Sequence, residues 1–377
     1  MENKLEKLLN KAAKLEKQGT QQSELAQIYR DIAACYHKQK EKAKETEYLG
    51  KYNDLKETIS KPEKQISLLL DEELDLIIEI DDLLEKYETL EKFVKKYPNF
   101  SRSYFEMAYL SEELELWRDA IDYYAKYIQH ENNENNLALA SNNLAIILSS
   151  HYYQLYNEAT VFYEKAIKLK PDYAEAYNNF ALHLEKDFCK QYDKAKEYYE
   201  IALKIMPFND QFYNNLAILL TNDHFKQYDK AKEYFEMALK FNPNNAKTYN
   251  NLANILAHDH FKQYDKAKKY LEKALKLNPN YEKAYNNFAN ILANDHFKQY
   301  DKAKEYFEKA VKLSPNYAKA YVNLANLLKN DYFKQYDKAK EYLEKAIEIN
   351  PNFAEAHNKL EILLNSDYFK QKDKTDE

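Results

Sequence analysis

A regular spacing of prolines is the feature that most constrains the fold of this 377-residue chain. Six of its eight prolines stand 36 residues apart, at Pro171, Pro207, Pro243, Pro279, Pro315 and Pro351. The text between them is nearly copied, since the segment His-Phe-Lys-Gln-Tyr-Asp-Lys-Ala-Lys begins at residues 224, 260 and 296. A fixed period of this size is typical of stacked supersecondary units, each of which contacts mainly its neighbours. The chain is therefore expected to fold as a solenoid.

Each period predicts two helices. The first is indicated by apolar residues at i, i+3, i+4 and i+7, which in one period are Tyr177, Phe180, Ala181 and Leu184. The second is indicated by the same spacing in Ala195, Tyr198, Tyr199 and Ala202, and it ends before Pro207. The small side chain of Ala181 allows the first helix to approach the second closely, because Ala195 and Ala202 leave a matching groove.

This order of residue types resembles the tetratricopeptide repeat (TPR). The resemblance extends over every period from 174 to 353, and further repeats fit at 138–173 and 101–134. It implies an all-α fold, a right-handed superhelical TPR solenoid of helix-turn-helix repeats. The family's usual period is 34 residues, whereas this chain uses 36. The two extra residues are expected between the helices, around 223–228, as a longer first helix or a longer turn.

The repeat pattern divides the chain into five predicted parts. Residues 1–60 are expected to form a TPR-like helical hairpin, and 61–100 an acidic helical hairpin that connects it to the array. Residues 101–353 hold about seven TPR units, 354–368 a capping helix, and 369–377 a flexible tail. The cap is predicted to turn Leu360, Leu363 and Leu364 toward its neighbour, while Glu361 stands where complete units have a small residue. The apolar, acidic stretch 66–84 is a possible surface for oligomerisation.

Composition argues against several functional classes. A net charge of −6 gives no general attraction to nucleic acid. The charged start and the lack of a long apolar run predict neither a secretory signal nor a membrane span. Two isolated cysteines, Cys35 and Cys189, fit a reducing compartment, so a cytoplasmic location is expected.

No catalytic motif is present in the sequence. Two glycines cannot form a dinucleotide fingerprint or a phosphate loop, and the metalloprotease and serine-hydrolase motifs are missing. The histidines at 224, 260 and 296 occupy identical places in successive repeats, whereas a catalytic site needs different groups that converge. They are interpreted as copied turn residues, with a metal or pH-sensing role as the alternative. The chain is predicted not to be an enzyme, and no cofactor is expected.

Rows of asparagine on the first helices are the candidate binding site. Their side chains project roughly opposite the packing residues, and in the resembled family that side lines the concave groove. The first row is Asn143, Asn179, Asn215, Asn251, Asn287 and Asn323; the second is Asn178, Asn214, Asn250 and Asn286; the third is Asn254, Asn290 and Asn326. One turn earlier on the same face stand Lys247, Lys283 and Lys319.

A row of amides can pair with the backbone of an extended peptide, because each amide offers both donors and an acceptor. The sequence therefore predicts a scaffold or adaptor that binds a protein or peptide partner in this groove. A competing interpretation is that the asparagines bond the neighbouring repeat and support packing only. The chain could also bind nucleic acid, as some helical-repeat proteins do, or assemble with itself as a structural protein.

Overall fold

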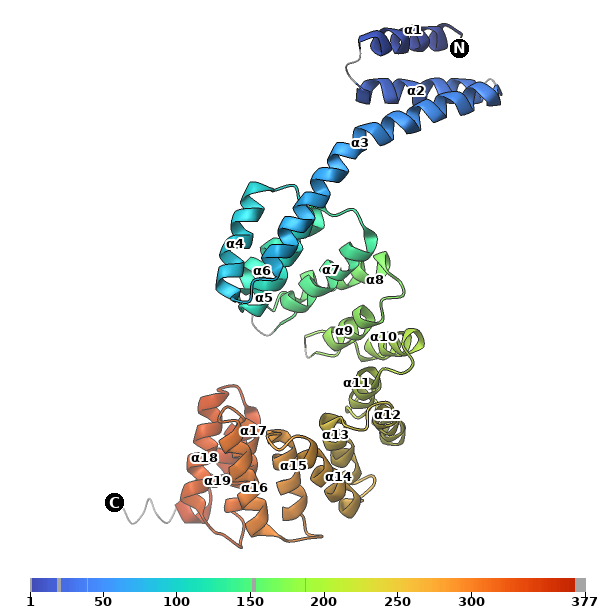
Figure 1. Ribbon diagram of the computed structural model, residues 1–377. Coiled ribbons are helices and arrows are strands. Elements are labelled where there is room, and N and C mark those ends of the chain that lie inside the picture. Colours follow the sequence, from blue (N-terminus) through green and yellow to red (C-terminus); the bar gives the residue numbers. More distant parts are fainter. Residues whose placement is uncertain (1, 19–21, 39, 151–153, 187, 370–377) are drawn as a thin grey trace. The chain divides into compact units, whose positions relative to one another are not determined.

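The computed structural model describes residues 2–18, 22–38, 40–150, 154–186 and 188–369, and the helices among them follow one another along the chain (Figure 1). Those before residue 154 are α1 (Glu2–Gln18), α2 (Gln22–Lys38), α3 (Lys42–Ile78), α4 (Leu83–Lys96), α5 (Ser101–Glu113), α6 (Trp117–His130) and α7 (Glu134–Leu148). Those after it are α8 (Tyr156–Leu169), α9 (Ala174–Leu184), α10 (Tyr192–Ile205), α11 (Asp210–Leu220), α12 (Tyr228–Phe241), α13 (Ala246–Ala257), α14 (Tyr264–Leu277), α15 (Glu282–Ala293), α16 (Tyr300–Leu313), α17 (Ala318–Leu328), α18 (Tyr336–Ile349) and α19 (Ala354–Leu364).

The chain divides into two compact units. Unit 1 comprises Met1–Tyr153 and unit 2 comprises Gln154–Glu377. The division falls between α7 and α8, inside the repeat predicted for 138–173. Among the described residues, no helix combines the length and the apolar character that a membrane crossing requires.

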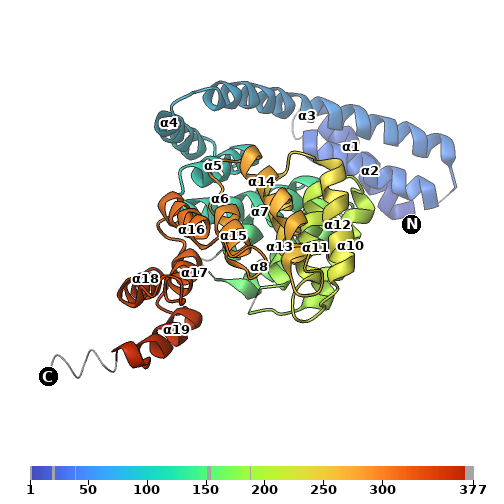
Figure 2. The same cartoon turned by 90° about the horizontal axis from the view of Figure 1, so that it is seen from below.

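Unit 2 is a stack of paired helices in which a first helix and a second helix alternate along the chain (Figure 2). The alanines that were predicted to allow close approach are completely buried, as Ala181, Ala195 and Ala202 show in the α9–α10 pair. The second helices keep the same small positions throughout, and one aromatic or leucine side chain fills the space between them, such as Phe235 or Leu271. The expected all-helical repeat architecture is therefore confirmed.

The two extra residues of each repeat lie in the turn between the helices. In the shorter repeat, residues 114–116 join α5 to α6, whereas residues 221–227 join α11 to α12. The longer turn is held by Asn222, whose side-chain oxygen accepts bonds from the backbone N–H groups of His224 and Phe225. Lys226 then adopts a left-handed conformation, with φ of 50°, before the second helix begins. The prediction of a longer turn is confirmed, and the alternative of a longer first helix is wrong.

Unit 1 begins with three helices that share an apolar core. Tyr29, Ile32 and Tyr36 of α2 are buried in it, and the ring of Tyr36 stacks on Tyr48 of α3 at 5.7 Å. Figure 2 shows α3 beside α2 over its first part and near α4 at its end. This helix is 37 residues long, so the boundary predicted between residues 60 and 61 falls inside it. The sequence there contains one proline, Pro62, and no glycine or turn motif, and the helix continues through it.

Candidate functional site

The first helices of unit 2 are joined by asparagine side chains that bond from one repeat to the next. Each bond runs from a first-row amide nitrogen to the second-row oxygen of the preceding repeat. The four bonds are Asn215 to Asn178 at 2.9 Å, Asn251 to Asn214 at 3.1 Å, Asn287 to Asn250 at 2.9 Å and Asn323 to Asn286 at 2.9 Å. The structure thus brings the first two predicted rows together into one ladder.

Within a repeat, the two asparagines are also bonded to each other. The amide nitrogen of Asn250 donates to the oxygen of Asn251 at 3.2 Å, and Asn286 donates to Asn287 at the same distance. Asn178 donates to Asn179 at 3.3 Å. An amide carries two N–H donors and an oxygen with two lone pairs, so these bonds use only part of the capacity of each side chain.

The second row of asparagines is mostly buried, which assigns it to packing between repeats. Asn178, Asn250 and Asn286 are almost fully buried, and Asn214 accepts a further bond from the Thr248 hydroxyl at 3.3 Å. Bonds of this kind between buried groups stabilise the stacking of repeats, which is the packing interpretation raised from the sequence. In unit 1, Asn143 donates to the Tyr124 hydroxyl at 3.1 Å, so it also contributes to packing.

The third row and the lysines are exposed. Asn254, Asn290 and Asn326 stand on α13, α15 and α17, and Lys247, Lys283 and Lys319 stand on the same helices. At the position of the third row, the two preceding repeats have Leu182, which is half-buried, and Ile218, which is 42% exposed. We call the surface formed by these eight residues the first-helix face. It changes along the stack from apolar to amide and lysine side chains.

One repeat of unit 2 holds two titratable side chains, His183 and Glu185, where the other repeats of this unit have neither histidine nor glutamate. His183 occupies the place of Leu219 and is 1% exposed, and its Nε2 atom lies 2.9 Å from the Thr160 hydroxyl. Burial lowers the pKa of His183 to about 4. Burial also raises the pKa of the Glu185 carboxyl to about 7, although it accepts a hydrogen bond from Tyr199.

The turn histidines pair with the preceding repeat. Nε2 of His224 lies 3.1 Å from Asp193, Nε2 of His260 lies 3.0 Å from Asp229, and Nε2 of His296 lies 3.3 Å from Asp265. In the next two repeats a tyrosine hydroxyl makes the equivalent contact, from Tyr332 to Asp301 at 2.6 Å and from Tyr368 to Asp337 at 2.5 Å. Sequence reasoning noted the histidines and missed their aspartate partners, although the constant offset of 31 residues was visible. In the described part of the chain, no three His, Cys, Asp or Glu side chains cluster closely enough to hold a metal ion.

Comparison with known proteins places these repeats in a family. Tetratricopeptide repeat profiles match residues 211–245, 234–269, 270–305 and 297–363. No curated protein matches the chain.

Several solved structures are similar to this chain. PilW, described as a widely conserved type IV pilus biogenesis factor, aligns with a TM-score of 0.50 and 23% identity over 60% of this chain and 99% of its own. PilF of Pseudomonas aeruginosa aligns with a TM-score of 0.45 and 23% identity over 59% and 97%. YrrB, described as a TPR protein with an unusual peptide-binding site, aligns with a TM-score of 0.36 and 28% identity over 52% and 96%. The family profiles and the paired helices lead to one conclusion: residues 211–363 of this chain are tetratricopeptide repeats.

Proposed function

We propose that this protein is a non-catalytic scaffold whose first-helix face binds an extended segment of a partner protein. The observation that carries the proposal is the exposed row Asn254, Asn290 and Asn326, which offers one amide per repeat. These helices are connected by the buried asparagine ladder, so the exposed amides stand on a preorganised layer. Regularly spaced amides fit a backbone that presents its own donors and acceptors at regular intervals.

The two ends of the first-helix face favour one direction of the bound segment. Leu182 and Ile218 offer apolar contacts in the earlier repeats. Lys247 and Lys283 offer positive charge in the later repeats, where an acidic side chain or a terminal carboxylate would pair with them. Three amide contacts contribute about 1.5 to 4.5 kcal/mol in total. Apolar and lysine contacts must supply the rest of the roughly −8 kcal/mol that corresponds to micromolar affinity.

The state of the cysteines favours a reducing cell compartment. The thiols of Cys35 and Cys189 are both without a disulfide, which fits a location such as the cytoplasm.

Binding to nucleic acid is the alternative function, and the lysines of the first-helix face favour it. The net charge of −6 opposes it, because phosphate backbones are held chiefly by excess positive charge.

The proposal is tested with peptides selected from a random displayed library against the full chain. The variant Asn254→Ala/Asn290→Ala/Asn326→Ala should bind the selected peptides at least tenfold more weakly. A matched control replaces Asn244, Asn280 and Asn316, which are exposed asparagines in the turns of the same repeats, and it should bind as the wild type does. If every selected peptide binds the first variant normally, the first-helix face is not the binding site.

A further inference from the structure

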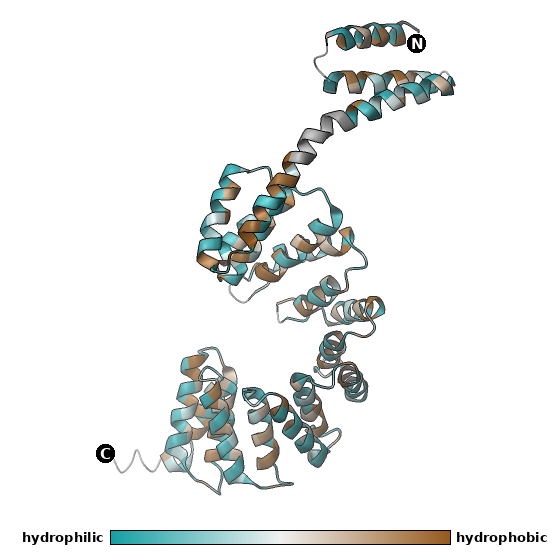
Figure 3. Ribbon diagram, viewed as in Figure 1, coloured by the Kyte–Doolittle hydropathy of each residue, from teal (hydrophilic) through white to brown (hydrophobic). Residues whose placement is uncertain are grey.

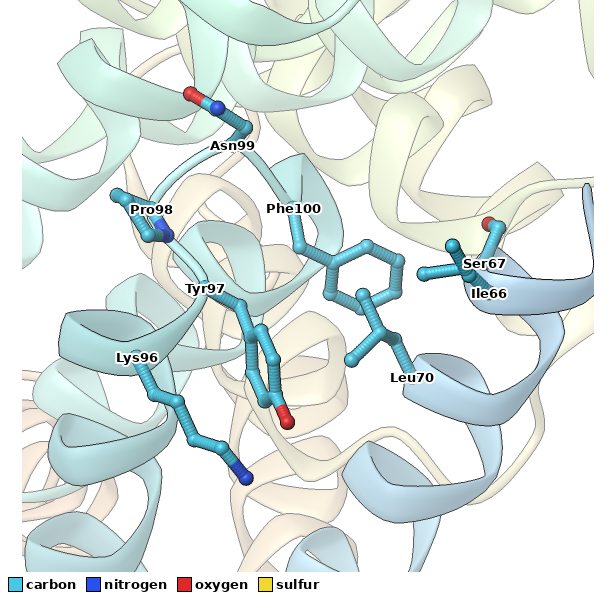
Figure 4. A pocket seen from close by; sticks show the side chains of 8 residues that line it. All are labelled: Ile66, Ser67, Leu70, Lys96, Tyr97, Pro98, Asn99 and Phe100. Carbon is cyan, nitrogen blue, oxygen red and sulfur yellow. The ribbon is translucent and has the colours of Figure 1, made fainter. Parts of the chain in front are cut away.

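A second surface is present in unit 1, where the end of α3 faces the turn that follows α4. A pocket of about 600 Å³ opens between them (Figure 4). Its lining residues are Ile66, Ser67, Leu70, Lys96, Tyr97, Pro98, Asn99 and Phe100. In Figure 4 the rings of Tyr97 and Phe100 lie toward Leu70, and Asn99 points away from them. We call this surface the α3 groove.

A large side chain stands beside the groove at a position where the repeats of unit 2 have a small one. In unit 2, the residue five positions before each repeat proline is alanine, as in Ala202 before Pro207. In the α3–α4 pair, the corresponding residue before Pro98 is Phe93, which is buried. Its ring packs 4.9 Å from Tyr97 and 6.0 Å from Phe100. Phe93 therefore supports the rings of Tyr97 and Phe100, which line the pocket.

The edge of the groove is an exposed apolar stripe. Ile66 is 58% exposed and Leu69 is 59% exposed, and they stand one turn apart on α3. Leu68 and Leu76 of the same helix are also exposed. Figure 3 shows hydrophobic colouring over this end of α3. Leu74 and Ile77, further along the same helix, are buried in unit 1, so the apolar surface of α3 extends beyond the part that the fold covers.

The surroundings of the stripe are acidic. Residues 71–91 contain ten aspartates and glutamates and one lysine. Basic side chains from neighbouring elements balance part of this charge: Arg102 pairs with Asp71 at 2.8 Å and with Asp75 at 2.6 Å, and Lys96 lies 3.6 Å from Glu73. Glu72 of α3 and Glu79, which directly follows the helix, are also exposed. A second copy of this surface, or an anionic membrane, would bring like charges together.

We propose that the α3 groove docks a basic amphipathic helix of a partner protein. The apolar side of that helix would cover Ile66 and Leu69 and place a side chain in the pocket, while its lysines or arginines would face the acidic rim. This site is separate from the first-helix face, and the chain would then hold two partner segments at once.

The test uses two synthetic peptides on the full-length protein. One is a fluorescently labelled 14-residue helix of leucine and lysine, and the other has glutamate in place of every lysine. The variant Ile66→Asp/Leu69→Asp removes the apolar stripe and adds negative charge, so a loss of binding to the basic peptide cannot be caused by weaker charge attraction. Both positions are exposed, and circular dichroism checks that the variant keeps its helix content. The control Ile362→Asp makes the same change at an exposed position of unit 2.

Fluorescence anisotropy should show the basic peptide binding at least tenfold more tightly than the acidic one. Ile66→Asp/Leu69→Asp should weaken that binding at least tenfold, while Ile362→Asp and the Asn254/Asn290/Asn326 alanine variant bind as the wild type does. Equal binding of the two peptides, or unchanged binding by the α3 variant, overturns the proposal. So does light scattering that shows a wild-type dimer which this variant converts to a monomer, because the occupant is then a second copy.

Discussion

The same residue type has two environments on the first helices, and these define two roles. Asn286 is 2% exposed and takes part in bonds to Asn287 and Asn323, whereas Asn290, one turn later, is exposed. Replacing Asn286 by Ala removes its bonds to Asn287 and Asn323, which are partly buried, and each lost bond costs about 0.5 to 1.5 kcal/mol. Replacing Asn290 should change stability by less than about 0.5 kcal/mol. Urea unfolding followed by circular dichroism measures both variants.

Peptide affinity should respond to these two variants differently from stability. Asn290→Ala should weaken a selected peptide without moving the unfolding midpoint. Equal midpoints for Asn286→Ala and the wild type would show that the buried ladder does not stabilise the stack.

His183 makes stability depend on pH on the acid side. Its pKa in the fold is about 4, below the ordinary value of 6.5, so the unfolded chain takes up the proton first as pH falls. The stability is complete above pH 6.5 and is lost as the pH falls toward 4. The variant His183→Leu introduces the residue that the next repeat has at this position. Its free energy of unfolding relative to the wild type should be about 2 kcal/mol higher at pH 5 than at pH 7.5. Urea unfolding of both proteins at the two pH values measures this difference, and an equal effect would contradict the assigned burial.

Glu185 has the opposite dependence. Its pKa is raised from 4.5 to about 7, so the stability linked to its protonated form is complete below pH 4.5 and is lost as pH rises through 7. Glu185→Gln should therefore stabilise the protein by about 1 to 3 kcal/mol at pH 8 and by little at pH 4. Thermal unfolding across this range tests the sign, and a larger gain at pH 4 would reverse the assignment.

At the scale of elements, the last described helix and the turn after it close the stack together. Leu363 of α19 is buried, but Leu364 is 40% exposed, so the expectation that Leu364 faces the neighbouring repeat is wrong. Phe369 supplies the missing cover, since it is 7% exposed and Tyr368 bonds to Asp337. The rest of the predicted tail, 370–377, lies outside the described residues.

Truncation measures how much α19 and the turn with Phe369 each stabilise the last complete repeat. Ending the chain after Asn352 should fray residues 318–352, because the apolar side of that repeat loses its cover. Ending it after Asn365 should weaken protection less, by about the 1.5 to 3 kcal/mol of one buried aromatic side chain. Hydrogen exchange at Leu324–Leu328 measures the order. Equal protection in both truncations would show that α19 is not the cap.

The helices and their pairing were predictable because each repeat carries its own alanines and a terminal proline. The asparagine bonds were harder to predict from the sequence. Asn250 and Asn254 lie on the same side of a helical wheel, and only the packing of the neighbouring repeat buries Asn250. His183 was missed because it replaces an aliphatic residue in one repeat only, and the rest of that repeat follows the common pattern. The α3 groove was missed for a similar reason. Phe93 stands where the later repeats have alanine five positions before the proline, but the turn that follows it, Tyr97-Pro98-Asn99-Phe100, resembles the later turns.

At the scale of the whole molecule, net charge limits the range of partners. The chain carries 56 basic and 62 acidic residues, so association with a polyanion gains little from released counterions. Fluorescence anisotropy with a generic RNA should show no binding at physiological salt. A submicromolar, salt-sensitive complex would favour the nucleic-acid function instead.

Photo-crosslinking tests the central claim, that an extended peptide lies on the first-helix face of unit 2. The amino acid p-benzoylphenylalanine is placed at position 290 in one protein and at position 280, in the turn before the same helix, in another. A selected peptide should crosslink to the protein labelled at position 290 and not to the one labelled at position 280. Crosslinking from position 280 alone, with none from position 290, would contradict the claim.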